Sequence, residues 1–196
     1  MSLNHPSDTR TSARLMAAAI DEAERAAGRG EVPIGAVLAD ADGVILARAG
    51  NAVEGYCTDS PDPEACAPDP AGHAEILVLR AAARHTGRPR LPGTVLYVTL
   101  EPCAMCAAAI SFARVARVVF AAEDPKGGAV VNGPRFFGQP TCHHRPEVEQ
   151  FDDGGRSAAL LRSFFRSRRG ARRRSTAGGD GRKAETWRDR MSTPGS

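Results

Sequence analysis

Long apolar runs and aromatic side chains are both scarce in this 196-residue chain. No apolar stretch approaches the roughly 18 residues that a membrane-spanning helix needs, and residues 1–14 lack the apolar segment of a secretion signal. Aromatic residues make up 5% of the chain, whereas the hydrophobic fraction of 42% is ordinary. We therefore expect a soluble, cytoplasmic protein with no membrane partner, and this length favours one domain with a full core.

Cysteine is also sparse, with five residues in all. An odd number, of which Cys103 and Cys106 have C-x-x-C spacing, fits a metal in a reducing compartment better than a disulfide framework. A second metal site could be built from the remaining candidates, which are Cys57, Cys66, Cys142, His143 and His144. Free thiols or an incidental pair explain Cys57 and Cys66 better.

Positive charge is concentrated at the C-terminal end. The net charge is +3, yet residues 171–196 alone hold seven Arg or Lys against three Asp or Glu. The rest of the chain is close to neutral, so its charge favours binding of a polyanionic partner only at the C-terminal end. We expect a disordered N-terminus over residues 1–10, a folded domain over 11–169 and a basic disordered tail over 170–196.

Hydrophobic periodicity predicts an alternation of helices and strands. Helices are expected over residues 11–27, 73–85, 103–112 and 157–169, and strands over 32–38, 44–49, 94–100, 115–121 and 148–151. A long loop rich in Pro, Asp and Gly covers residues 54–72. This order predicts an α/β fold with three α/β/α layers, in which helices cover both faces of a mixed five-stranded sheet.

Two short motifs carry the chemistry. His73-Ala74-Glu75 opens one predicted helix, and Pro102-Cys103-Ala104-Met105-Cys106 opens another. One imidazole and two thiolates suit Zn²⁺ and leave a fourth position open for water, as at catalytic sites. His73 and Glu75 can both face one ion only at a helix start, so we expect two helix starts to converge on the metal.

Glu75 is the candidate proton carrier. Zinc lowers the pKa of bound water to about 7, and a nearby carboxylate can act as general base and then as general acid. A closed structural zinc site is the alternative, and it needs a fourth ligand that His85, Cys57 or Cys142 could supply. A structural site has no use for Glu75, which favours catalysis.

The motifs and their flanks resemble a known family. H-x-E followed by P-C-x-x-C is the signature of zinc-dependent nucleobase deaminases, and residues 31–37 (EVPIGAV), 96–106 (LYVTLEPCAMC) and 117–120 (RVVF) extend the resemblance. The chain is similar to the cytidine-deaminase-like superfamily and, within it, to the bacterial tRNA-specific adenosine deaminases. The more discriminating stretch is residues 163–169 (SFFRSRR), with paired Phe and clustered Arg.

The resemblance implies a hydrolase that converts adenosine to inosine at the wobble position of a tRNA anticodon. It implies one Zn²⁺ per subunit and a homodimer in which tRNA contacts both subunits. The residues it assigns to the substrate are Asn51, Val32, Pro33 and Asp124, and those it assigns to RNA are Arg166, Arg168 and Arg169. Alternatively, Asn51 and Asp124 only stabilise turns of the backbone. The three arginines could likewise belong to a solvated helix end that contacts no RNA.

Two alternatives remain open. A deaminase of a free base or nucleoside, such as guanine or cytosine, would share the metal motifs but have no use for the basic helix. An RNA-binding module with structural zinc would have no use for Glu75. The 54–72 loop and the tail after Gly170 depart from the family pattern.

Overall fold

The computed structural model describes residues 9–55 and 67–177, with side chains as far as Gly170. Its elements follow the predicted order: α1 (Thr9–Gly28), β1 (Gly35–Ala39), β2 (Ile45–Gly50), α2 (Ala74–Thr86), β3 (Val95–Leu100), α3 (Ala104–Ala113), β4 (Arg117–Ala122), a short 3-10 helix η2 (Phe136–Gly138), β5 (Glu147–Gln150) and α4 (Arg156–Ala177). Residues 1–164 form one compact unit, and residues 165–196 form a second. Among the described residues, no helix is long and apolar enough to cross a membrane.

A mixed five-stranded sheet is the centre of the first unit. Its strand order is β2-β1-β3-β4-β5. β1 runs antiparallel to β2 and β3, whereas β3, β4 and β5 are parallel. The three inner strands are almost wholly buried, as their continuous apolar sequences predict.

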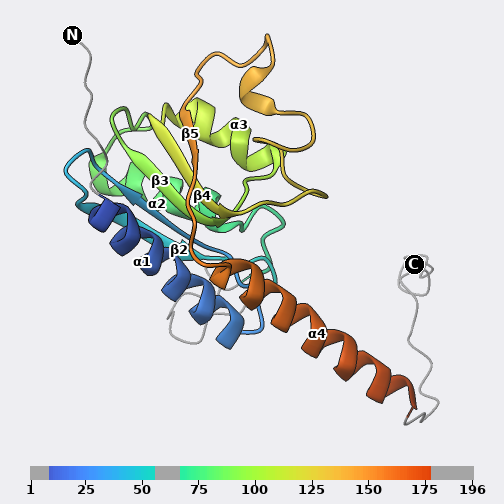
Figure 1. Ribbon diagram of the computed structural model, residues 1–196. Coiled ribbons are helices and arrows are strands. Elements are labelled where there is room, and N and C mark those ends of the chain that lie inside the picture. The colour runs from blue at the N-terminus through green and yellow to red at the C-terminus, as the bar shows by residue number, and fades with distance from the viewer. Residues whose placement is uncertain (1–8, 56–66, 178–196) are drawn as a thin grey trace, which may run out of the picture. The chain divides into compact units, whose positions relative to one another are not determined.

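Helices cover both faces of this sheet (Figure 1). Because side chains alternate along a strand, Leu38 and Val98 pack with α2 and α3 on one face. Val37 and Tyr97 pack on the other face with Leu15 and its neighbours in α1. The expected three-layer α/β/α architecture is therefore confirmed.

Some boundaries differ from those expected. β1 begins at Gly35, not at Val32, because Pro33 has no N–H to donate to a ladder and the Ile34 N–H bonds locally to the Val32 carbonyl. α1 begins at Thr9, within the expected disordered N-terminus. α4 continues to Ala177, so residues 170–177 are helical although disorder was expected there. A single Gly costs a helix only about 1 kcal/mol relative to Ala, and Arg and Ala around Gly170 favour continuation. The rest of both expected disordered segments, 1–8 and 178–196, lies outside the described residues.

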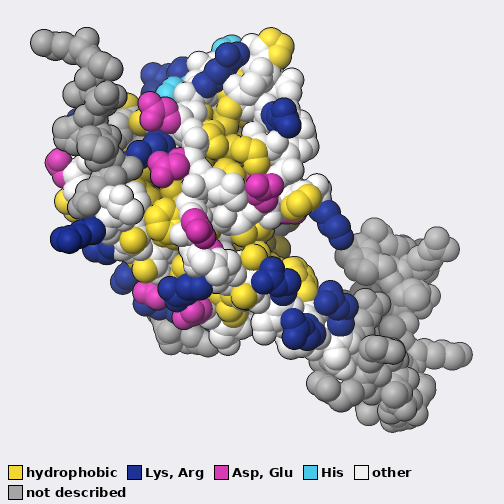
Figure 2. All heavy atoms as spheres, viewed as in Figure 1, with side chains coloured by type: hydrophobic (Ala, Val, Ile, Leu, Met, Phe, Trp, Pro, Cys, Tyr) yellow, Lys and Arg dark blue, Asp and Glu magenta, His cyan; other side chains and the backbone are white. Residues whose placement is uncertain are grey.

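The described surface of the first unit is mixed in charge. On the face shown in Figure 2, basic and acidic side chains alternate with apolar ones across the described residues. This agrees with the near-neutral balance of the chain before residue 171.

Candidate active site

Two helix starts meet at the predicted metal ligands. His73 is the N-cap residue of α2 and Cys103 is the N-cap residue of α3. The His73 Nδ1 lies 3.7 Å from the Cys103 Sγ and 3.4 Å from the Cys106 Sγ. Among the described residues, these three make the one group of His, Cys, Asp or Glu side chains close enough to share an ion. The expected convergence of two helix starts is confirmed.

The spacing of these atoms fits zinc. Tetrahedral bonds of about 2.0 Å to nitrogen and 2.3 Å to sulfur place the two donor atoms about 3.5 Å apart. The observed separations of 3.4 and 3.7 Å lie on either side of that value. The described structure holds no fourth protein ligand in this group, which is the arrangement of a catalytic site.

The two thiols differ in acidity. A hydrogen bond from the Cys106 thiol is the main reason that the pKa of Cys103 falls to about 4; burial opposes this effect, and the His73 imidazole adds to it. The same bond, together with burial, raises the pKa of Cys106. The hydrogen bond to Cys103 raises the pKa of His73, against the effect of burial. Cys103 is thus ready to bind a cation as a thiolate.

Glu75 is buried beside the three ligands. Its exposed fraction is 3%, and its Oε2 has no hydrogen-bond partner. Burial raises the pKa of this carboxyl above its ordinary value. A hydrogen bond to its own backbone and the nearby His73 lower the pKa, but their effects are smaller than that of burial. A buried carboxyl with an open oxygen can hold a proton and pass it on.

Asn51 fixes the start of α2. His73 makes no side-chain cap, and the Asn51 Oδ1 instead accepts a hydrogen bond of 3.1 Å from the Ala74 N–H. The Asn51 N–H donates to the Ile34 carbonyl over 2.9 Å, which brings the segment with Val32 and Pro33 beside it. The capping role escaped sequence analysis because Asn51 and Ala74 are far apart in the chain.

Asp124 takes part in a turn. Its Oδ1 accepts the Lys126 and Gly127 N–H groups, each over 3.0 Å. The structure therefore supports the turn-chemistry explanation for one carboxylate oxygen. Asp124 is only half-buried, and its Oδ2 is not engaged in this turn.

Glu101, which sequence analysis missed, gathers the loop that carries Asp124. It lies directly after β3, 2% exposed, and directly before Pro102-Cys103. Its carboxylate accepts N–H groups of Asp124, Val130, Val131 and Asn132. Burial raises the pKa of Glu101, but these bonds and the Asn132 side chain outweigh it, so the pKa lies below its ordinary value. An acidic residue at the end of a buried apolar strand was the available signal.

The proposed second metal site finds no support in its described members. The Cys142 Sγ contacts the Ser111 hydroxyl at 3.5 Å and the His144 carbonyl at 3.1 Å. The His144 Nε2 lies 2.6 Å from the Val115 carbonyl. These contacts fasten the segment before β5 to the end of α3. Cys57 and Cys66 lie outside the described residues.

Arg166, Arg168 and Arg169 lie on the part of α4 that belongs to the second unit. All three side chains are exposed. Exposed guanidinium groups on a helix are suited to phosphate contacts.

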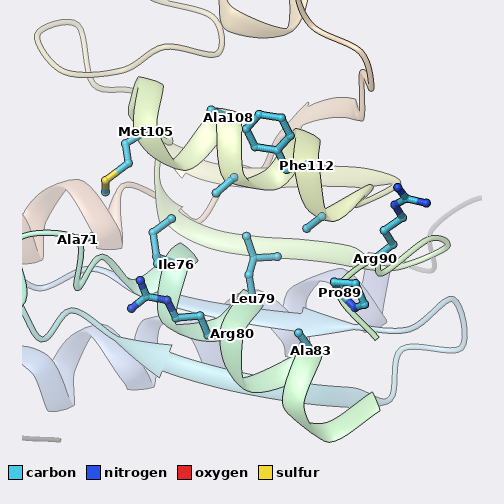
Figure 3. Close-up of a pocket in the computed structure, with 12 residues that line it drawn as sticks. Ala71, Ile76, Leu79, Arg80, Ala83, Pro89, Arg90, Met105, Ala108 and Phe112 are labelled. Carbon is cyan, nitrogen blue, oxygen red and sulfur yellow. The ribbon is translucent and has the colours of Figure 1, made fainter. Parts of the chain in front are cut away.

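An apolar groove lies between α2 and α3, next to the metal ligands. Figure 3 shows Ile76 and Leu79 of α2 pointing towards α3, whose Met105, Ala108 and Phe112 also line the groove. The groove has a volume of about 800 Å³. Phe112 is 73% exposed and Met105 is 39% exposed, which is unusual for large apolar side chains that line the same groove.

Residues 9–122 match the family described as the cytidine and deoxycytidylate deaminase zinc-binding region. This stretch contains His73, Glu75, Cys103 and Cys106, and it covers more than half of the chain. The chain therefore belongs to this family of zinc-binding deaminases.

The similar proteins narrow the comparison further. A tRNA-specific adenosine deaminase of Agrobacterium fabrum is 52% identical over 155 residues, which cover 79% of this chain and 94% of that protein. The tRNA-specific adenosine deaminase of Bacillus subtilis is 40% identical over 162 residues, covering 81% and 93%. A solved structure from a study of A-to-I editing by tRNA:A34 deaminases at the wobble position shares 51% identity, covers 76% of this chain and 99% of that one, and has a TM-score of 0.67. The resemblance expected from the sequence is confirmed.

The fold itself is shared more widely. A guanine deaminase of Nitrosomonas europaea has a TM-score of 0.60 at 20% identity, covering 84% of this chain and 95% of that one. At this identity the likeness concerns the architecture alone.

Proposed function

We propose that this chain is a zinc-dependent hydrolase that deaminates adenosine to inosine at the wobble position of a tRNA anticodon. The observation that carries the chemistry is the convergence of His73, Cys103 and Cys106 at two helix starts, beside the buried Glu75. The choice of substrate is supported by the 52% identity to a tRNA-specific adenosine deaminase over most of both chains. Reduced thiols and a tRNA substrate are consistent with action in the cytoplasm.

In this proposal His73, Cys103 and Cys106 hold one zinc ion per subunit. When bound, zinc acts as the Lewis acid that makes water nucleophilic near neutral pH. Cys103, with its low pKa, offers a thiolate without a large proton cost.

Glu75 moves the protons of the reaction. It takes a proton from the water that attacks C6 of adenine and delivers it to the ring nitrogen. It then takes the remaining proton from the new C6 hydroxyl and gives it to the amino group, so that the C6 carbonyl forms, the C–N bond breaks and ammonia leaves. The burial of Glu75 supports this role, because burial raises the pKa of the carboxyl and so makes it a better proton acceptor than an exposed carboxylate.

Recognition of the nucleotide is assigned to the loops around this centre. Asn51 donates from Nδ2 to the base, Val32 and Pro33 border it, and the Oδ2 of Asp124 meets the sugar or backbone. A looped anticodon base is already unstacked, so its extrusion into such a site costs little.

Arg166, Arg168 and Arg169 contact tRNA phosphates in this proposal, as parts of the basic C-terminal segment. Replacing all three by Ala should weaken tRNA binding and lower the slope of log Kd against log salt by about 0.7 to 0.9 for each phosphate that is no longer neutralised. An unchanged slope would remove these arginines from the interface.

A homodimer is the proposed assembly, with the α2–α3 groove as the contact surface. The support is the exposure of Phe112 and Met105 in an apolar groove. Because Met105 stands between the ligands Cys103 and Cys106 in the chain, a second copy on this surface would border each metal centre.

The deciding experiment measures inosine formation on a tRNA with A at the wobble position, beside free guanine, cytosine and adenosine. We expect turnover of the tRNA and little or none of the free compounds. Turnover of a free base without turnover of tRNA would replace this proposal by the free-base alternative. Zinc binding without any deamination would favour a structural zinc module.

A further inference from the structure

The buried Glu101 carboxylate accepts five hydrogen bonds. Its Oε1 accepts the consecutive N–H groups of Val130, Val131 and Asn132 at 3.0, 2.8 and 2.9 Å. Its Oε2 accepts the Asp124 N–H at 3.1 Å and the Asn132 Nδ2 at 2.7 Å. Successive backbone N–H groups aimed at one anion form a nest, and hydrogen bonds to a charged acceptor are roughly twice as strong as neutral ones.

The loop that carries the nest is also held by turns of its own and by the buried side chains of Ala129 and Val130. Residues 123–132 follow β4, and their described pairing with a neighbouring strand end is one isolated bridge between Gly128 and Cys103. The Ala129 N–H adds a bond of 2.9 Å to the Pro102 carbonyl. A side chain at Gly128 would collide with the Glu101 carboxylate, so the loop backbone lies directly on this group.

Glu101 also stands next to the metal ligands in the chain. Only Pro102 separates it from Cys103, the N-cap residue of α3. The carboxylate therefore connects two parts of the site: the helix start that carries Cys103 and Cys106, and the loop that carries Asp124.

We infer that Glu101 is a positioning residue, whose buried carboxylate holds the 123–132 loop so that Asp124 faces the nucleotide bound at the metal centre. The inference rests on the proposed function and on the role proposed there for Asp124. Glu101 itself does not touch the substrate; it acts through Asp124. A loop displaced by about 1 Å can cost a reaction about 100-fold.

The test variant is Glu101→Gln, which keeps the shape of the side chain. The substitution replaces one carboxylate oxygen by an NH₂ group, which donates. If the remaining oxygen keeps the three hydrogen bonds at Oε1, the NH₂ group faces the Asp124 N–H, so two donors oppose each other. We expect kcat/KM for tRNA to fall 10- to 100-fold while zinc content stays at the wild-type level. Glu149→Gln is the matched control, because this half-buried Glu lies on β5 and, in the described structure, forms an ion pair with Arg117.

A double-mutant cycle separates positioning from general support. Asp124→Ser keeps an oxygen for the turn but removes Oδ2. If Glu101 acts through Asp124, Glu101→Gln should cost less than threefold in the Asp124→Ser background, whereas a merely structural role gives the full loss in both backgrounds. Full additivity, or an Asp124→Ser variant with wild-type kcat/KM, would overturn the inference.

Amide hydrogen exchange tests the anchoring without any substrate. In Glu101→Gln the amides of Asp124, Val130, Val131 and Asn132 should exchange at least tenfold faster, while those of β3 and β4 stay protected. Unchanged exchange in the loop would also overturn the inference. If wild-type protein binds zinc but does not deaminate tRNA, the proposed function is contradicted instead. The hydrogen-exchange measurement would then still test whether Glu101 holds the 123–132 loop.

Discussion

Glu75 is buried beside the metal ligands, and one of its carboxylate oxygens lacks a hydrogen-bond partner. Glu75→Gln keeps the volume of the side chain but cannot carry a proton between two sites. We expect about 100- to 10,000-fold lower turnover of tRNA, with zinc content unchanged by elemental analysis. Retained turnover would show that another group moves the protons.

Asp153 offers a stability test that is separate from activity. It accepts the Gly155 N–H and the Ser157 N–H at the start of α4, each within 2.9 Å. Burial raises the pKa of Asp153, but the nearby Ser157 hydroxyl and hydrogen bonds from backbone N–H groups outweigh it, so the folded pKa lies below 3.8. A depressed carboxyl pKa means that the ionised form adds stability above the unfolded pKa, and that this stability is lost as pH falls through the folded pKa.

Asp153→Asn should therefore lower the free energy of unfolding by about 0.5 to 1 kcal/mol at pH 7. The difference from wild type should shrink at the lowest pH at which both proteins stay folded, because the native carboxyl becomes protonated as pH falls through its folded pKa. Urea unfolding of both proteins in metal-free form measures it. A difference that is the same at both pH values would mean that the charge of Asp153 is irrelevant.

Residue type and spacing together predicted the cluster of His73, Cys103 and Cys106, because imidazole and thiol groups are recognisable metal ligands and their spacing places them at helix starts. Asn51 and Glu101 could not be placed in the same way. Their roles depend on which backbone N–H groups face them, and those groups lie between 23 and 31 residues away. Sequence spacing does not show such convergence, and the Asx turn at Asp124 depends equally on local backbone geometry.

At the scale of elements, α1 packs against β1 with almost no room at Gly35. A Cβ on Gly35 would collide with the Ala19 carbonyl and come within 2.5 Å of the Ala23 nitrogen. Gly35→Ala should therefore cost about 1 to 3 kcal/mol of stability or more, measured by urea unfolding. Gly28→Ala is the control, because nothing lies within 4 Å of its Cβ position. Equal stability of the two variants would argue against the close α1–β1 contact.

Periodicity predicted every helix and strand of the sheet layers, since burial on one or both faces leaves a clear apolar pattern. It misplaced the ends of elements where the apolar pattern extends beyond the residues that pair in the sheet, as at Val32 and Pro33 before β1. It also ended α4 early, because low-complexity basic sequence carries no packing signal although Arg and Ala are good helix formers.

At the scale of the whole molecule, zinc would join two helix starts that are 30 residues apart in the chain. A ligand that binds only the folded state stabilises it by about 2.7 kcal/mol at a concentration 100 times its Kd. Chelation should then lower Tm by about 5 to 10 °C, and His73→Ala should remove this sensitivity. A Tm unaffected by chelation of zinc-loaded protein would contradict a metal that bridges α2 and α3.

The proposed dimer depends on the α2–α3 groove. Phe112→Asp puts a charge at its most exposed apolar side chain, so we expect monomers in sedimentation velocity at micromolar concentration. Val44→Asp is the control, because Val44 is 59% exposed but lies outside the groove. A Phe112→Asp variant that stays dimeric would move the contact to another surface.

The hydrogen bond from the Ala74 N–H to Asn51 has a consequence for protein engineering. If Asn51 contacts the base as proposed, it is the first position to vary when a different base is wanted, yet the same carboxamide fixes the helix start that carries His73. A library at Asn51 would therefore lose many variants to poor metal loading before base selectivity could be scored. Val32, which borders the same region without capping a helix, is the better first position to randomise.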